Sequence, residues 1–301
     1  MLKIGIIGLG DIAQKAYLPL FSRMKDIECH LYTRDSAKLA ALGEKYRFTK
    51  LYPSLEELLS SGIEAAFVHS STSSHAEIVR ELLERGIHVF VDKPITDNYN
   101  EAKKLVELAE KQNRMLMVGF NRRYAPSVRS LKEVAEPNFV LVQKNRHSLP
   151  GDTRTFIYDD FIHVIDTLRY LHPHPIKEII VNGRKDGGTL YHVVLQFVSA
   201  EGTAIGIMNR DNGATEEIAT VMGPREKRTA YNLSRLVITK GMEEIEVRSS
   251  DWEETLAKRG FISMIEDFLS AIRAGSVVGI PARDALETHR LCEEVILKLE
   301  Q

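Results

Sequence analysis

A glycine-rich turn near the start of the chain has the residue types and spacing of a phosphate-binding turn. Ile4 to Ile7 form a short apolar run that predicts a buried strand, and Gly8-Leu9-Gly10-Asp11-Ile12-Ala13 follows it and opens a predicted helix. In this pattern Gly8 permits a tight turn, Gly10 lets the backbone approach a pyrophosphate, and the small Ala13 lets the helix pack close to the strand. The helix N-terminus offers N–H groups to the phosphates. We therefore expect a dinucleotide site here, and an ordinary strand–turn–helix is the alternative.

A lysine follows another predicted strand, His88–Val91, within the sequence Asp92-Lys93-Pro94. The carboxyl end of a central strand faces the crevice in which α/β sheets bind ligands, so Lys93 is a candidate for contact with a substrate. Pro94 fixes its own φ and stiffens the turn that carries the lysine. The alternative is a surface lysine at a strand–loop junction.

Three ionisable residues stand at helical spacing within an otherwise apolar stretch. Asp159, His163 and Asp166 occupy positions i, i+4 and i+7, which lie on one face of an α-helix. A carboxylate one turn from a histidine can orient the ring and set its tautomer, as proton transfer near neutral pH requires. The alternatives are a helix cap made by the aspartates, Asp160 in particular, and a histidine whose ring is satisfied inside the core.

Two patterns are compatible with metal binding, and neither carries the assignment. His172-Pro173-His174-Pro175 follows a predicted helix end and is better explained as a rigid polar turn. Asp159, Asp160, His163 and Asp166 could ligate a divalent cation, but the adjacent apolar residues and Lys93 argue against it. We assign no metal site.

These motifs together resemble those of the Gfo/Idh/MocA family of NAD(P)-dependent oxidoreductases. Five motifs occur in the family's order, namely GLGDIA, Ser73-Ser74-His75, Asp92-Lys93-Pro94, Gly119–Pro126 and the Asp-x-x-x-His-x-x-Asp made by Asp159, His163 and Asp166. The resemblance covers essentially the whole chain. The stretches YDDFIHVIDTLRYL and GFNRRYAP are most similar to the MviM-like branch of the family.

The resemblance implies a role for each matching residue. Lys93 would bind the substrate oxygen at the reacting carbon and stabilise charge on it, His163 would exchange a proton with that oxygen, and Asp159 would orient His163. The nicotinamide would exchange hydride with the same carbon, which requires the hydroxyl proton to leave as well. The cofactor-binding residues would be Gly8, Gly10, Asp11, Ile12, Ala13, Thr33, Arg34, Lys38, Ser70, His75, Asp92 and Lys93. The substrate-binding residues would be Lys93, Arg122, Arg123, Asp160 and His163.

The chain departs from the family pattern at three places. Asp92 replaces the family's Glu, which shortens the carboxylate arm beside the nicotinamide by one methylene. Arg154-Thr155-Phe156 stands where glycines usually precede the histidine motif, and Phe161 replaces the glycine two residues before His163. A bulkier wall predicts a smaller or differently shaped substrate pocket than in typical sugar dehydrogenases. Arg122 and Arg123 could also bind backbone carbonyls at the domain hinge instead of substrate.

The end of the second predicted strand decides between NAD and NADP. An acidic residue there accepts hydrogen bonds from the ribose 2′-OH and repels a 2′-phosphate. This chain has Thr33-Arg34-Asp35, with Lys38 one turn into the next helix, and a hydroxyl and a guanidinium at the 2′-oxygen favour NADP. If Asp35 takes the ribose position instead, NAD is favoured. In a third interpretation Asp35 or Ser36 only caps the helix and Arg34 is a solvated charge.

Strand and helix patterns alternate over the first 120 residues. They predict strands at Ile4–Ile7, Glu28–Thr33, Ala65–His69, His88–Val91 and Met115–Gly119, with helices at Ser36–Tyr46, after Ser54, at Ser74–Arg85 and from Asn98 to Gln112. Near-continuous apolar strands between helices indicate a doubly wound parallel sheet, a Rossmann fold. Pro19 is expected near the first turn of a restarted helix.

After Tyr124 the pattern changes to a run of alternating strands flanked by helices. Strands are predicted at Phe139–Lys144, Glu178–Asn182, Tyr191–Phe197, Thr203–Asn209, Glu217–Met222, Leu236–Lys240 and Glu244–Arg248, and helices at Ala125–Val134, Phe161–Leu171, Gly260–Ala274 and Arg283–Glu300. We expect a dinucleotide-binding domain over 1–121 and an α+β substrate-binding and oligomerisation domain over 122–301 with a largely antiparallel open sheet. The final helix could pack back on the first domain, and the active site is expected between the two.

Composition excludes several classes of protein. The 301 residues carry a formal net charge of −2, which gives no global reason to bind nucleic acid or an anionic membrane. No stretch approaches the ~20 apolar residues of a membrane span, and the apolar start is too short for a signal peptide. Cys29 and Cys292 lack metal-like spacing and fit a reducing cytoplasm. We expect a cytoplasmic protein.

Two classes of function remain. The first is an NAD(P)-dependent dehydrogenase or reductase acting on a hydroxyl or carbonyl carbon of a sugar, cyclitol or related small metabolite. The second is a non-catalytic, nucleotide-sensing regulator on the same fold. Retention of both Lys93 and His163 favours the enzyme, because a sensor needs neither. The alternating run Tyr191–Phe197 and the small-residue run Thr203–Met208 favour a homo-oligomer, a dimer or a tetramer, formed through a sheet face that no helix covers.

Overall fold

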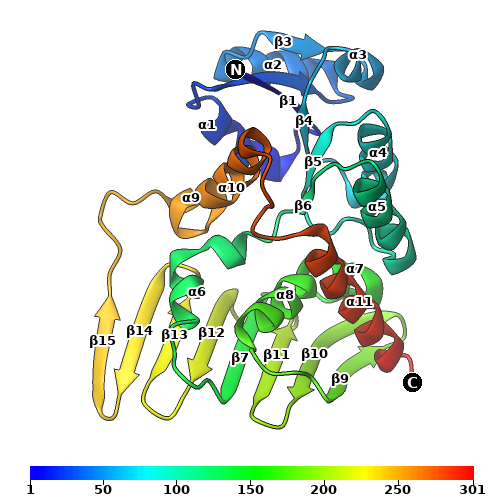
Figure 1. The fold of residues 1–301 in the computed structure, drawn as a ribbon. Coiled ribbons are helices and arrows are strands. Elements are labelled where there is room, and N and C mark those ends of the chain that lie inside the picture. Colours follow the sequence, from blue (N-terminus) through cyan, green and yellow to red (C-terminus); the bar gives the residue numbers. More distant parts are fainter. The chain divides into compact units, whose positions relative to one another are not determined.

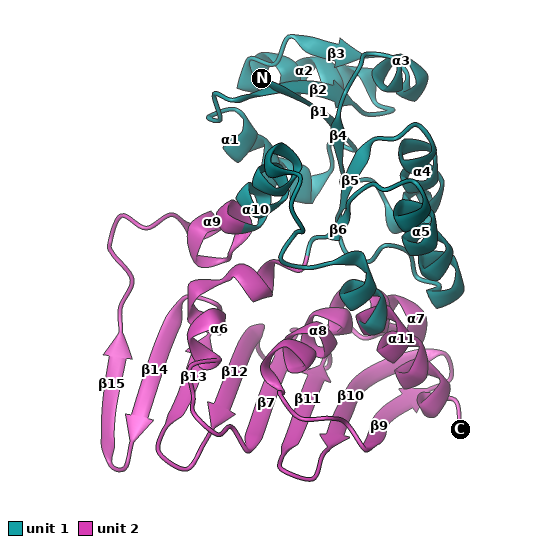
Figure 2. Ribbon diagram, viewed as in Figure 1, with its two compact units in different colours: residues 1–119, 264–287 teal, residues 120–263, 288–301 magenta.

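A computed structural model describes all 301 residues, which form two compact units (Figures 1 and 2). The first unit contains Met1–Gly119 and Met264–Glu287, and the second contains Phe120–Ser263 and Thr288–Gln301. The first is a six-stranded parallel sheet with helices, and the second is built on a nine-stranded, mostly antiparallel sheet. The expected fold class is confirmed.

The first unit follows the doubly wound pattern. Its elements are β1 (Leu2–Ile7), η1 (Ala13–Tyr17), α1 (Leu18–Phe21), β2 (Ile27–Tyr32), α2 (Ser36–Tyr46), β3 (Lys50–Tyr52), α3 (Leu55–Leu59), β4 (Ala65–Val68), α4 (Thr72–Glu84), β5 (His88–Val91), α5 (Tyr99–Lys111), β6 (Leu116–Val118) and most of α10 (Phe261–Ala274). The strand order is β3-β2-β1-β4-β5-β6, so the winding direction reverses between β1 and β4. In this architecture the carboxyl ends of these two strands form the expected ligand crevice.

Side-chain caps begin three helices of this unit where the sequence predicts them. Asp35 accepts a hydrogen bond from Lys38 N at the start of α2, Ser54 accepts one from Glu57 N at the start of α3, and Asn98 caps α5 in the same way. Each cap satisfies an N–H group that the first helical turn leaves without a partner. The predicted bounds of α2 and of β5 are confirmed, whereas the short β3 was not predicted.

A π-helical turn precedes Pro19. The turn η1 covers Ala13–Tyr17, and Pro19 lies in the first turn of α1, which begins at Leu18. Proline has no N–H to donate, so it is tolerated in a first helical turn and not in a helix interior. The predicted restart of the helix near Pro19 is confirmed.

The helix α10 returns to the first unit, which changes the expected domain division. Phe268 on α10 packs edge-on against Phe67 of β4 and Phe90 of β5, with ring centroids 5.3 and 5.7 Å apart. Because this apolar contact completes the core of the first unit, residues 264–287 belong there and not to a continuous second domain over 122–301. The remainder of the last helix, from Thr288, belongs to the second unit.

The second unit contains one large sheet and its covering helices. Its elements are η2 (Asn121–Tyr124), α6 (Pro126–Leu131), β7 (Phe139–Asn145), β8 (Gly151–Asp152), α7 (Thr153–Phe156), η3 (Ile157–Phe161), α8 (Ile162–Leu171), β9 (Glu178–Asp186), β10 (Thr189–Val198), β11 (Thr203–Asn209), β12 (Glu216–Met222), β13 (Lys227–Tyr231), β14 (Arg235–Lys240), β15 (Glu243–Val247), α9 (Thr255–Lys258) and the greater part of α11 (Ala282–Leu299). The order is β15-β14-β13-β12-β7-β11-β10-β8, with β9 paired to β10. Only β7 and β11 pair in parallel.

Several parts of this unit differ from the prediction, including the unpredicted β8 and α9. The helical segment begins at Thr153 and passes through the π turn η3 before α8, eight residues before the predicted start at Phe161. Strand β13 was not predicted, because its sequence KRTAY carries too little apolar alternation to stand out. The bounds predicted for β11 are confirmed.

One face of the large sheet is covered by helices. Helices α8 and α6 pack on it (Figure 1), and a Cβ on Gly206 of β11 would lie 2.6 Å from Leu168 Cδ1 of α8. Because side chains alternate along a strand, Ile205 and Ile207 point to the opposite face. Both are only partly buried within this chain.

No helix of the structure is long and apolar enough to cross a membrane. Both cysteines, Cys29 and Cys292, are buried thiols and form no disulfide.

Candidate functional site

A cavity of about 650 Å³ lies in the first unit at the carboxyl ends of β1, β2 and β4. It gathers eight of the residues predicted to bind the cofactor: Gly8, Gly10, Asp11, Ile12, Thr33, Arg34, Lys38 and Ser70. These residues come from three separate βα connections. The cavity therefore lies where a doubly wound sheet binds a dinucleotide.

The two glycines of the first turn have different steric surroundings. Gly8 adopts φ +86°, and a Cβ there would lie 2.5 Å from Ser70 N, so only glycine fits. A Cβ on Gly10 would meet no protein atom closer than His69 O at 4.0 Å. The space above Gly10 is thus open to the cavity, as the approach of a pyrophosphate to the backbone requires. Ala13 is fully buried, which fits its expected packing role.

The part of the cavity beside the carboxyl end of β2 carries positive side chains. Thr33 directly follows β2, and Thr33, Arg34 and Lys38 all line the cavity, whereas Asp35 does not. The Asp35 carboxylate caps α2 through a 2.9 Å hydrogen bond from Lys38 N. The interpretation of Asp35 as a helix cap is thus confirmed, and Thr33, Arg34 and Lys38 are the residues of this segment that line the cavity.

The turn that carries Lys93 is tied to its neighbours by hydrogen bonds. Lys93 is half-buried, and its peptide bond to Pro94 is cis. The ring nitrogens of buried His75 lie 2.8 Å from Pro94 O and 3.0 Å from Ser70 O. His75 therefore links this turn to the end of β4 and does not itself line the cavity, and its expected contact with the cofactor stays a prediction.

Asp92 lies in an aromatic and polar cluster that sequence reasoning missed. Tyr17 donates a 3.1 Å hydrogen bond to Asp92 Oδ1, and His69, stacked on the Tyr17 ring, places Nδ1 3.8 Å from Asp92 Oδ2. Burial by itself raises the pKa of Asp92. The combined effect of His69, Lys93 and the Tyr17 hydroxyl is larger and opposite, so the net pKa lies below its usual range. Asp92 is therefore an anion at neutral pH. Its contacts with a histidine and a tyrosine were not deducible from sequence spacing.

His163 lies in the second unit, on α8, and contacts Arg122. The Nη1 of Arg122 is 3.1 Å from His163 Nδ1 and 3.3 Å from Nε2. A guanidinium can only donate, so the ring nitrogen that pairs with it carries a lone pair and no proton. Arg122 itself is held by two 2.9 Å bonds to the Glu217 carboxylate. The structure thus gives the imidazole a cationic partner that sequence spacing did not predict.

Asp166 forms a structural ion pair. Its carboxylate accepts two hydrogen bonds from Arg123, at 2.9 and 2.6 Å, and one from Thr288 at 3.0 Å. It is 1% exposed, so this pair is inside the core of the second unit. Arg122 and Arg123 thus bind carboxylates of the protein, and neither pairing was anticipated.

The π turn η3 separates the two neighbouring aspartates. Asp159 is exposed, whereas Asp160 is buried and pairs with Lys144 and with Arg146, whose Nε lies 2.7 Å from Asp160 Oδ2. The predicted stripe of Asp159, His163 and Asp166 assumed an α-helical pitch throughout. A π turn adds about one residue per turn, so the residues on either side of it no longer share one α-helical face.

Lys144 and Glu217 are two neighbouring charged residues inside the second unit that sequence analysis also missed. They are direct neighbours across β7 and β12 and stand at inward positions of their strands. Burial, together with repulsion from Arg122, lowers the pKa of Lys144 to about 7. A signal for both exists in the sequence, since each places a charge at an inward position of an alternating strand.

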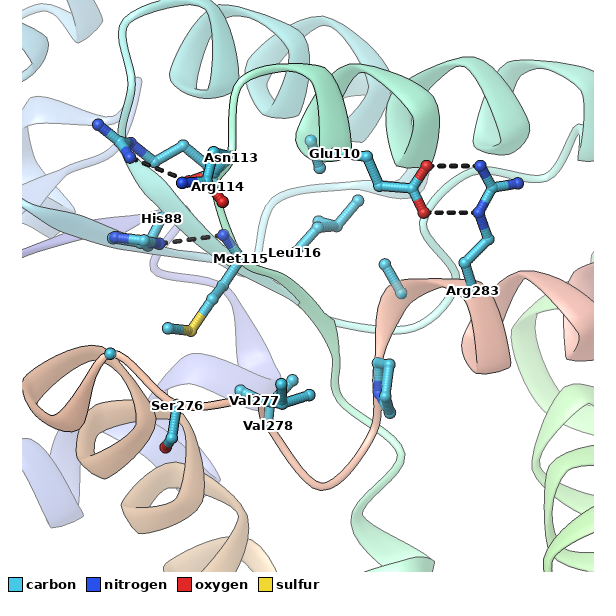
Figure 3. A pocket seen from close by; sticks show the side chains of 14 residues that line it. His88, Glu110, Asn113, Arg114, Met115, Leu116, Ser276, Val277, Val278 and Arg283 are labelled. Carbon is cyan, nitrogen blue, oxygen red and sulfur yellow. Dashed lines mark hydrogen bonds and ion pairs between the residues drawn. The ribbon is translucent and has the colours of Figure 1, made fainter.

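A second cavity of about 600 Å³ lies in the first unit at the amino ends of the strands, opposite the carboxyl ends that line the first cavity (Figure 3). It is lined by the first residues of β5 and β6, His88 and Leu116, and by the loop that follows α10. Of its charged residues, Glu110 and Arg283 pair with each other and Arg114 donates to Gly86 O, while His88 Nδ1 accepts from Met115 N at 3.0 Å. These amino ends of parallel strands are not where such sheets bind nucleotides.

The fold and the glycine cradle together define a dinucleotide-binding oxidoreductase of the Rossmann class. Residues 2–120 match the family described as "Oxidoreductase family, NAD-binding Rossmann fold", Gfo/Idh/MocA. The chain belongs to this family and is an enzyme of the dehydrogenase type.

Relatives of known structure or curated sequence match almost the whole chain. The YceM protein of Salmonella typhimurium is 30% identical over 97% of this chain and 96% of its own. The crystal structure of a dehydrogenase (MviM) from Clostridium difficile is 30% identical, covers 99% of both chains and superposes with a TM-score of 0.95. The myo-inositol 2-dehydrogenase of Thermotoga maritima is 24% identical over 94% of this chain and 92% of its own.

Proposed function

We propose that this protein transfers a hydride between a nicotinamide dinucleotide and a hydroxyl or carbonyl carbon of a sugar, cyclitol or related small metabolite. The observation that carries the proposal is the open space above Gly10 in a cavity at the switch point of the sheet. Retention of Lys93 and His163 and the similarity to a myo-inositol dehydrogenase support the substrate class.

Each proposed residue has a defined chemical task. Lys93 holds the substrate oxygen and stabilises negative charge on it, which lowers the cost of losing the hydroxyl proton. His163 takes that proton in oxidation and returns it in reduction. When bound, the nicotinamide accepts or supplies the hydride. We also propose that Asp159 tunes His163. Asp160, Arg122 and Arg123 are proposed to lie near the substrate.

NADP is the proposed cofactor in preference to NAD. Arg34 and Lys38 line the cavity, and the carboxylate that would repel a 2′-phosphate, Asp35, is engaged as a helix cap. Arginine and lysine are the side chains that recognise phosphate through charge-assisted hydrogen bonds.

The test of the activity is a spectrophotometric panel. Absorbance of reduced nicotinamide is followed with both cofactors against polyols, cyclitols, aldoses and their keto forms. Turnover by the unaltered protein is expected to fall at least ~100-fold in Lys93→Ala and in His163→Ala, while nucleotide binding by the His163 variant stays unchanged. Turnover of a variant at the parental rate would contradict the mechanism. Nucleotide binding without any turnover would instead indicate the nucleotide-sensing regulator.

The cofactor preference has its own measurement. Dissociation constants of NADPH and NADH are compared by fluorescence titration in the unaltered protein and in Arg34→Ala. We expect NADPH to bind more tightly, and the substitution to weaken NADPH at least ~10-fold while NADH changes little. The matched control is Arg80→Ala. Arg80 is exposed and pairs with Glu101, which lies far along the chain from Arg34. Equal constants, or tighter NADH, would contradict the preference.

Two further proposals concern the whole protein. We propose a homo-oligomer formed through the uncovered face of the large sheet, supported by the partly buried Ile205 and Ile207. We also propose a cytoplasmic location, supported by two buried thiols that form no disulfide.

A further inference from the structure

A cluster of cations surrounds the Arg122–His163 pair in the second unit. It consists of five basic residues: Arg122, Lys144, Arg146, Arg210 and Arg259. Three carboxylates belong to the same cluster, Asp159, Asp160 and Glu217, so positive charge is in excess. All eight residues lie in one compact unit.

Three of the cations form ion pairs with carboxylates of the protein. Arg122 forms its two bonds with Glu217, and Lys144 and Arg146 share the single carboxylate of Asp160. The strands position these groups, because Lys144 and Glu217 face each other on the helix-covered side of the sheet. Arg146 N bonds Asn209 O at 2.9 Å, which brings Arg210, the next residue, to the same end of the sheet.

Arg210 forms no direct ion pair, although Asp160 and Asp159 attract it electrostatically. Its Nε is buried without a hydrogen-bond acceptor, and its guanidinium lies 4.8 Å from the centre of the Phe156 ring. Burial lowers its pKa, and Asp160 and Arg146 both act on it electrostatically, which places it within the cluster. A guanidinium N–H that is buried without an acceptor costs free energy, which a bound acceptor would recover.

Arg259 is the second cation without a carboxylate in ion-pair distance. Its backbone is fixed, because Asn121 Nδ2 donates a 2.8 Å bond to Arg259 O. Gly260 follows at φ +80°, with Asn121 O 2.4 Å from the position of a Cβ. Burial and repulsion by Arg122 lower the pKa of Arg259, so it lies within electrostatic range of the residue that contacts His163.

We propose that Arg210 and Arg259, with Arg146, bind an anionic group on the substrate, a carboxylate or a phosphate, next to His163. This inference deepens the proposed function and rests on it, because the bound anion is called part of a substrate on the basis of the proposed dehydrogenase activity. An arginine offers only donors, in a planar fork that matches carboxylate and phosphate oxygens. A neutral polyol presents hydroxyls that both donate and accept, and a site for it alone would not need two cations that form no direct ion pair.

The experiment compares matched neutral and anionic probes. D-Glucose, D-glucuronate and D-glucose 6-phosphate are titrated by calorimetry into the full-length protein with saturating NADPH, and the same three are tested for turnover with both cofactors. We expect at least one anionic probe to bind at least tenfold more tightly than glucose, and its affinity to fall with added salt. The two anionic probes distinguish a carboxylate site from a phosphate site.

Variants test whether the two arginines carry this discrimination. Arg210→Gln and Arg259→Gln are each expected to weaken the anionic probe at least tenfold and to leave glucose within twofold. Arg225→Gln is the control, because this arginine is 80% exposed in the same unit. Equal affinity for all three probes, or a loss that is the same for glucose and the anions, would overturn the anion site.

The two proposals fail in distinguishable ways. If the anionic probe binds and the arginine variants lose it, but no compound in any panel is turned over with either cofactor, the dehydrogenase function fails and the anion site stands. If neutral sugars are turned over with a kcat/KM equal to that of their acids and phosphates, the function stands and the anion site fails.

Discussion

Glu217 is the residue on which the charged interior of the second unit depends. It holds the Arg122 guanidinium by two 2.9 Å bonds, and Arg122 in turn contacts the His163 ring. Burial by itself raises the pKa of Glu217. Attraction from Arg122, Lys144 and Arg259 has a larger and opposite effect, so the net pKa lies below the usual range. This carboxylate therefore connects the histidine to the rest of the cation cluster.

We predict that Glu217→Gln destabilises the protein by about 3 kcal/mol at pH 7, because it leaves a buried guanidinium without its counter-charge. The pKa of Glu217 is lowered on folding, so its contribution is present above the unfolded pKa of about 4 and is lost as the pH falls through the folded value. The difference between variant and unaltered protein should therefore shrink below pH 4. Urea unfolding at pH 7 and at pH 3 measures it.

The neighbouring Glu216→Gln is the control for this prediction. Glu216 points to the other face of β12, and its Oε1 accepts a 2.9 Å bond from Asn145. Its substitution should cost less than about 1 kcal/mol, with little change between the two pH values. A Glu217→Gln penalty that stays constant down to pH 3 would contradict the assignment of this linkage to Glu217.

At the residue scale, sequence reasoning found motifs and missed partners. Gly8, Gly10, Thr33 and Arg34 were placed at one cavity, because a glycine turn and strand ends have fixed positions in a doubly wound sheet. The contacts of Arg122 join residues 95 positions apart in sequence, and no local pattern encodes such a pairing. Roles for Lys93, Asp159 and His163 stay predictions until turnover is measured.

At the element scale, the segment Asn121–Tyr124 is held by a single glycine. This short helix, η2, carries Arg122, and Gly260 packs against it from a distant part of the chain. A Cβ on Gly260 would lie 2.4 Å from Asn121 O and 2.5 Å from Ala125 N, both backbone atoms that cannot move without displacing η2. The position of Arg122 thus depends on the absence of a side chain at Gly260.

We predict that Gly260→Ala costs at least about 3 kcal/mol, since steric overlap adds to the strain of a positive φ. The matched control is Gly241→Ala, because Gly241 also has a positive φ, +58°, but no atom lies within 4 Å of its Cβ position. The control should cost only about 1 kcal/mol. Thermal and urea unfolding compare the two, and equal losses would show that η2 is not pressed against this glycine.

Elements with strong local signals were predictable and those with π turns were not. The helix Ser36–Tyr46 has a capping aspartate and an apolar face, and its predicted bounds are confirmed. No local signal of this kind marks the π turn at Ile157–Phe161, which contains the buried Tyr158 and Phe161. A shift in pitch at that turn moved Asp160 inward and left Asp159 exposed.

At the scale of the whole molecule, the large sheet has one face that its own helices do not cover. Cross-strand register brings Val194, Ile207, Gln143 and Ile218 into one row on that face, and Ile205 lies beside Leu141 in the next. Aliphatic side chains predominate in these rows, although Gln143 interrupts the first, and together they form a largely apolar patch. Such a patch is a typical surface for association with a second copy.

We predict that the protein in dilute solution has a mass that is a multiple of 34.0 kDa, and that Ile207→Lys reduces it to a single chain. A lysine in the centre of the apolar rows would bury a charge without a partner on each subunit, which a symmetric interface repeats. Light scattering after size exclusion, over a tenfold range of concentration, measures the mass. Val277→Lys is the control, because Val277 is 79% exposed in the first unit and outside the sheet. A mass of one chain for the unaltered protein would contradict the oligomer, and loss of assembly in both variants would show that the face of β11 is not the interface.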